Sequence, residues 1–126
     1  MSFQTDRQRV EGLGSAKDGT HEWWGQRVSA IALIPLVVLF VLPFAYHLGA
    51  DYDEIRKVYS HPVNAIVGIL FFITITFHIR HGLQEVIVDY VHGKKKLTFA
   101  LLANTLFTTV LGVTGVFSIA KIAFGG

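Results

Sequence analysis

The sequence predicts an all-α membrane protein with three transmembrane helices. The chain has 126 residues, 52% of them hydrophobic, and a mean hydropathy of +0.48. This apolar content is too high for a water-soluble globule of this size. Polar stretches separate three long apolar segments, each able to cross a hydrocarbon core of about 30 Å. We therefore expect an amino-terminal arm over residues 1–25 and a membrane region over residues 26–126.

Charge and cysteine content narrow the possible functions. The formal net charge of +2 is too small to indicate nucleic-acid binding. Cysteine is absent, so this chain supplies no disulfide, no thiolate or iron–sulfur ligand and no covalent haem attachment. Any cofactor would be held by histidine or by polar contacts.

The arm and the first helix meet at a cluster of aromatic and basic residues. Residues 1–25 are polar, without the apolar run of a signal peptide, and residues 12–15 within them are expected to be irregular and extended. Trp23 and Trp24 mark the headgroup level, and a first helix over about 27–48 follows, in which two prolines should produce kinks. Arg27 opens this helix. It either snorkels to the interface or binds an anionic or carbonyl-bearing ligand.

The second and third helices are expected over 62–91 and 97–122, after a short polar connection over 49–60. Pro62 suits a first helical position, and Gly93 with three lysines should end the second helix. At about 43 Å that helix is longer than the membrane needs, so it tilts or its last turns leave the lipid. In the third helix, small residues predict a face for close packing: Thr108, Thr109, Gly112, Gly115 and Ser118.

Basic residues predict the orientation. They gather in the arm and at 94–96, whereas the 49–60 connection has two bases against three acids. The positive-inside rule therefore puts the amino terminus and the 92–96 loop in the cytoplasm.

Titratable residues lie inside the second helix, and this stripe marks the candidate site. At about 100° per residue its members fall on one arc: His78, His81, Gly82, Glu85 and Asp89. A charged group near the bilayer centre costs about 3 kcal/mol, so these side chains should face protein, cofactor or water.

Several kinds of chemistry fit the stripe. His78 at mid-membrane is either a haem iron ligand or a histidine bonded to a neighbouring helix, and His78 with His81 is a weaker candidate for a small metal site. Asp89 and Tyr90, with Arg27 at the same membrane face, have the groups needed to bind and protonate a quinone. They could equally be an ordinary interfacial helix end.

The spacing His78-x-x-x-Gly82-(x)6-Asp89-Tyr90 resembles the hydrophobic membrane anchor of succinate dehydrogenase, respiratory complex II. The segment His21-(x)5-Arg27-x-x-Ala30 and the three-helix layout agree with this family, and the arm from Gly12 to Lys17 resembles its alphaproteobacterial members.

The resemblance implies a role for each matching residue. His78 would be an axial ligand of haem b, shared with a histidine of the companion membrane anchor. Tyr90 would hydrogen-bond a ubiquinone carbonyl, Asp89 would orient the arginine of the site and help deliver protons, and Arg27 would lie near the haem propionates and the quinone. His81 and Glu85 depart from the family pattern and have no implied role.

The resemblance also implies the assembly. The chain would be part of a heteromeric helix bundle in the bacterial inner membrane, together with the companion anchor, the iron–sulfur protein and the flavoprotein of succinate dehydrogenase. It would help to pass electrons from succinate to ubiquinone without oxidising succinate itself. The anchor of a quinol:fumarate reductase shares this architecture. A haem-free proton relay or transporter component, with the stripe as its titratable chain, is the alternative of a different class.

Overall fold

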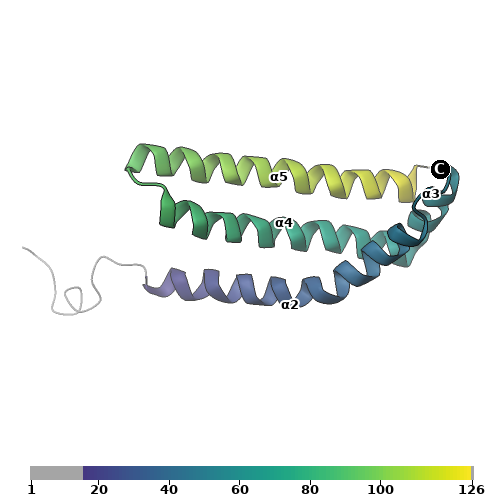
Figure 1. Ribbon diagram of the computed structural model, residues 1–126, viewed down its shortest axis with the longest axis horizontal. Coiled ribbons are helices and arrows are strands. Elements are labelled where there is room, and N and C mark those ends of the chain that lie inside the picture. The colour runs from purple at the N-terminus through teal and green to yellow at the C-terminus, as the bar shows by residue number, and fades with distance from the viewer. Residues whose placement is uncertain (1–15, 126) are drawn as a thin grey trace, which may run out of the picture.

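A computed structural model describes the backbone of residues 16–125 and the side chains of residues 23–125. All regular secondary structure in this part of the chain is α-helical, with no strand (Figure 1). The elements are α2 (Ala16–Tyr46), α3 (Tyr52–Ser60), α4 (Pro62–Tyr90) and α5 (Lys94–Phe124). Three helical segments are long and apolar enough to cross a membrane: Trp23–Tyr46, Pro62–Tyr90 and Lys94–Phe124. The predicted fold class is confirmed.

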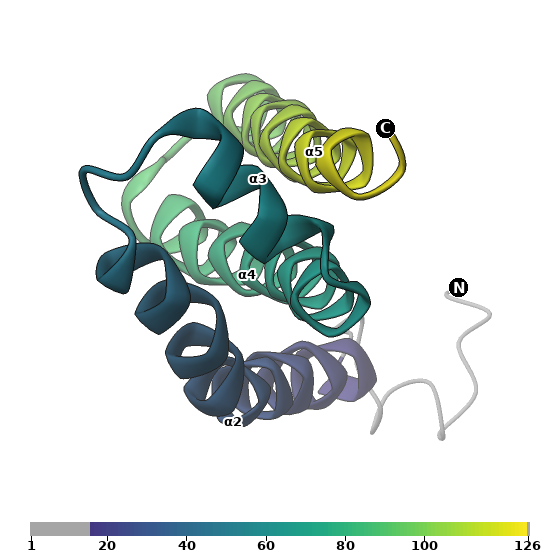
Figure 2. The ribbon, with the colours of Figure 1, turned by 90° about the vertical axis from the view of Figure 1, so that its right-hand side faces the viewer.

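The long helices lie side by side, with α4 in the middle (Figure 1). α4 packs against α2 on one side and against α5 on the other. The short α3 crosses one end of the bundle, which we call the α3 end, and the α4–α5 connection lies at the opposite end (Figures 1 and 2).

α2 begins at Ala16, well before the start predicted at about residue 27. The prediction equated the helix with its apolar run, but a helix propagates through polar residues once it has nucleated. Residues 16–26 contain no proline, and two glycines cost only about 1 kcal/mol each. The apolar span itself begins near Trp23, so the predicted membrane boundary and the helix start are different features. The arm predicted over 1–25 is thus helical from residue 16, and its residues 12–15, expected to be extended, lie outside the described residues.

The connection predicted over 49–60 contains α3, so reading it as a polar loop was wrong. Ile55, Val58 and Tyr59 lie on one face of α3 and pack into the core at this end, and the charged side chains occupy the other face. The sequence does carry a helix signal, with acids in the first turn and Lys57 in the last.

α4 matches its predicted bounds within one residue, and Pro62 occupies its first turn as expected. α5 begins at Lys94 rather than 97, and it ends at Phe124 rather than 122. Gly93 lies directly before α5 as its N-cap, and its φ of 99°, which glycine adopts readily, turns the chain so that α5 begins at the next residue. The three lysines are therefore the first turn of α5 rather than part of a loop.

Side chains of α3 form hydrogen bonds to backbone carbonyls of α2 and α5. The Tyr59 hydroxyl donates to the Phe40 carbonyl of α2 at 3.0 Å, and the Ser60 hydroxyl donates to the Ile122 carbonyl of α5 at 3.1 Å. Arg56 also donates to the Gly125 carbonyl. Burial raises the pKa of the Tyr59 phenol, which keeps it protonated as a donor. These bonds fix the α3 end of the bundle.

Small residues bring α4 and α5 together. Gly112 lies against Thr76 and Gly115 against Phe72, and Thr108 is the most deeply buried side chain, with 1% exposure. The predicted packing face is confirmed for these three residues. It is wrong for Thr109 and Ser118, which are exposed and bond to carbonyls of their own helix.

Gly115→Ala should weaken this packing. A β-carbon at this position would overlap the Phe72 ring, so one helix must shift. Overpacking of this kind costs about 1–3 kcal/mol, and we expect a lower melting temperature of the detergent-solubilised protein. Gly25→Ala is the matched control, because its β-carbon would meet Phe77 only at an ordinary 3.4 Å. Equal melting temperatures for wild type and Gly115→Ala would contradict the predicted close contact.

Candidate functional site

His78 lies between α4 and α2, where it contacts a buried serine. The Ser29 hydroxyl oxygen is 3.0 Å from His78 Nδ1 and 2.9 Å from the Gln26 carbonyl oxygen of its own helix. Ser29 is only 5% exposed, and His78 is half-buried. The predicted haem ligand thus has one ring nitrogen held by α2.

Gly82 leaves room for the Gln26 side chain of α2. A β-carbon at Gly82 would lie 3.2 Å from Gln26 Nε2, and such a contact is tighter than nearly all real ones. Gln26 therefore lies over Gly82 one helical turn from the Ser29–His78 contact. Its Oε1 is buried without a hydrogen-bond partner among the described residues.

An apolar groove of about 460 Å³ adjoins this contact between α2 and α4. Ser29 forms part of its wall, and small residues on α2 keep it open. The other lining residues are Trp24, Gly25, Val28, Ala32, Ile73, Thr74 and Phe77. A flat, largely apolar ligand suits such a space.

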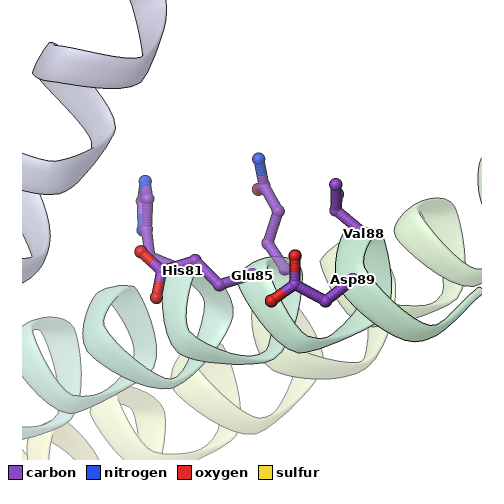
Figure 3. A pocket seen from close by; sticks show the side chains of 5 residues that line it. His81, Glu85, Val88 and Asp89 are labelled. Carbon is purple, nitrogen blue, oxygen red and sulfur yellow. The ribbon is translucent and has the colours of Figure 1, made fainter.

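The remaining titratable residues of the stripe share a second, smaller pocket of about 280 Å³ nearer the end of α4 (Figure 3). It is lined by His81, Gln84, Glu85, Val88 and Asp89. Their labelled side chains point to the same side of α4 in Figure 3. The predicted common face of His81, Glu85 and Asp89 is confirmed.

His78 and His81 have different partners. His81 Nδ1 is 2.8 Å from the Phe77 carbonyl oxygen, and its ring packs on that of Phe77 with centroids 4.1 Å apart. Within residues 23–125, no three His, Cys, Asp or Glu side chains are grouped so that they could hold a metal ion. The arrangement offers single imidazoles rather than a chelating cluster.

Tyr90 and Arg27, which were predicted to lie at the same membrane face, both have exposed side chains. Tyr90 is the last residue of α4 and is 79% exposed. The Arg27 guanidinium lies 4.9 Å from the centre of the Trp23 ring in a cation–π contact. Among the described residues, neither Arg27 nor Asp89 forms an ion pair. These exposed groups are available to a ligand or a partner chain.

Reasoning from the sequence gave no role to Ser29, Gln26 or Gln84, which belong to these sites. Ser29 carries a weak signal, as a small polar residue at the start of an uncharged run. Gln26 carries none, because its place over Gly82 depends on how the two helices pack.

Residues 1–113 match the model of the succinate dehydrogenase/fumarate reductase transmembrane subunit family. The chain is 30% identical over 125 residues to a succinate dehydrogenase hydrophobic membrane anchor subunit of Paracoccus denitrificans, covering 99% of this chain and 96% of that protein. It is 33% identical over 107 residues to that of Rickettsia bellii, covering 84% and 85%. A succinate dehydrogenase membrane anchor subunit of Reclinomonas americana is 31% identical over 84 residues, covering 63% and 68%. No solved structure matches.

Proposed function

Because this chain belongs to the succinate dehydrogenase/fumarate reductase transmembrane subunit family, we propose that it helps to bind haem b and forms part of the ubiquinone reduction site of succinate:ubiquinone oxidoreductase. The chain is a multi-pass membrane protein and works in a complex with other subunits. We propose a companion membrane anchor, the iron–sulfur protein and the flavoprotein as its partners, with succinate oxidation confined to the flavoprotein. The basic residues favour an amino terminus on the cytoplasmic side of the inner membrane.

The contact between His78 and Ser29 carries the haem part of the proposal. Serine holds one ring nitrogen, which leaves the other for a metal. The adjoining apolar groove, with Gly25 and Ala32 on its α2 wall, suits a flat macrocycle. A single imidazole beside apolar walls fits haem better than a bare metal ion. His78 would be one axial ligand and a histidine of the companion anchor the other, and bound haem b supplies a one-electron redox centre within the membrane.

The end of α4 supports the quinone part. Reduction of ubiquinone to ubiquinol consumes two electrons and two protons, so the site needs donors at the carbonyl oxygens and a route for protons. The Tyr90 hydroxyl would donate to one carbonyl oxygen. Asp89, whose pocket is open to solvent, would relay protons, and Arg27 would polarise the quinone or bind the haem propionates. The exposure of all three side chains fits a site that is completed by partner proteins.

A haem-free proton relay is the second candidate, because His81, Glu85 and Asp89 share one pocket. A reduced-minus-oxidised spectrum of the purified membrane complex separates the two functions. We expect the absorption band of a b-type haem, with succinate as the reductant. A complex that contains this chain but lacks the band would favour the relay.

The direction of the reaction is also part of the proposal. The relatives are named as succinate dehydrogenase subunits, which favours succinate oxidation over fumarate reduction. Faster turnover with succinate and ubiquinone than with fumarate and a low-potential quinol would support this direction, and the reverse ratio would contradict it.

A further inference from the structure

We infer that Ser29 is a positioning residue for His78, fixing the imidazole so that Nδ1 carries the proton and Nε2 presents its lone pair to the iron. This inference rests on the proposed haem ligation by His78. Its basis is the hydrogen-bond geometry of one buried hydroxyl group between two helices.

The protons can be assigned from the partners of the Ser29 hydroxyl. The Gln26 carbonyl, 2.9 Å away, can only accept, so it takes the single hydroxyl proton of Ser29. The Ser29 oxygen then offers a lone pair to His78 Nδ1 at 3.0 Å, and that nitrogen must be the donor. A neutral imidazole protonated at Nδ1 is unprotonated at Nε2, which is the form that binds a metal.

Two features hold this geometry in place. Ser29 is buried, so water does not compete for its oxygen. Gly82, one turn along α4, has no side chain to push Gln26 away, and Gln26 supplies the carbonyl that orients the hydroxyl. The glycine four residues after the histidine thus leaves room for the Gln26 side chain next to the imidazole contact.

The predicted consequence is electronic. A hydrogen bond from Nδ1–H to an oxygen makes the imidazole a stronger donor at Nε2, which stabilises ferric over ferrous iron. Without the Ser29 oxygen, ferrous iron is stabilised relative to ferric iron, so the midpoint potential of haem b rises. We expect the ratio of reduced to oxidised haem at a fixed potential to increase severalfold.

The test uses the assembled complex with Ser29→Ala and Ser29→Thr. The readouts are haem content, a potentiometric titration of the haem b absorption and the paramagnetic resonance signal of the oxidised haem. We expect Ser29→Ala to retain haem with a more positive potential and a shifted signal, and Ser29→Thr to restore both. Ser118→Ala is the control, since its exposed hydroxyl bonds only to the Thr114 carbonyl of its own helix, and it should change neither.

The outcomes separate this inference from the proposed function. An unchanged potential and signal in Ser29→Ala, or a more negative potential, would overturn the role of Ser29. Should Ser29→Ala fail to assemble, Ser29→Cys provides the same test, because a thiol is a weaker acceptor. A wild-type complex without haem b would instead refute the haem ligation, and with it the premise.

Discussion

Replacing His78 by Ala should remove or strongly alter the absorption of haem b in the assembled complex. His78 is the stripe histidine that lies half-buried in the α2–α4 interface, bonded to Ser29 beside an apolar groove of about 460 Å³. Alanine offers no ligand atom, so the iron would lose an axial bond. The measurement is the reduced-minus-oxidised spectrum, normalised to the amount of purified complex.

His81→Ala is the matched control for this prediction. It makes the same chemical change three residues away, at a ring that packs on Phe77 and bonds to the Phe77 carbonyl. We expect the spectrum of this variant to match the wild type. A spectrum changed by His81→Ala alone would transfer the ligand role to His81.

Replacing Tyr90 by Phe should slow quinone reduction by about tenfold or more, because the phenol would no longer donate to the quinone carbonyl as negative charge develops there. Phenylalanine keeps the ring, so an exposed position at the end of α4 should tolerate the change. The measurement compares two rates in the same preparation. One is succinate-dependent ubiquinone reduction, and the other is reduction of an artificial acceptor that takes electrons upstream of the quinone.

Only the first of these rates should fall. Tyr46→Phe, at an exposed tyrosine on α2 near the α3 end, is the control and should leave both rates unchanged. Equal losses of both activities in Tyr90→Phe would point to a damaged complex and would remove the quinone role from Tyr90.

The sequence was sufficient for those parts of the fold that depend on local pattern. Long apolar runs predicted the three spans, Pro62 marked the start of α4, and Gly93 marked the boundary between α4 and α5. Helical periodicity placed His81, Glu85 and Asp89 on one face, as observed. The family resemblance was confirmed by the match over residues 1–113.

The misses have a common physical origin, because each depends on contacts between segments. α3 carries its own helix signal, but its burial depends on contacts with α2 and α5. Likewise, Ser29 and His78 are 49 residues apart in the chain, and their contact depends on how α2 packs against α4.

The order of the helices has a consequence for biogenesis. Each long helix packs against the next long helix in the chain, α2 on α4 and α4 on α5. Synthesis proceeds from the amino terminus, so the hairpin of α2 and α4 can assemble in the membrane before α5 has left the ribosome. The Ser29–His78 contact lies wholly within this first hairpin. The nascent chain can therefore form the Ser29–His78 contact while its last span is still being translated.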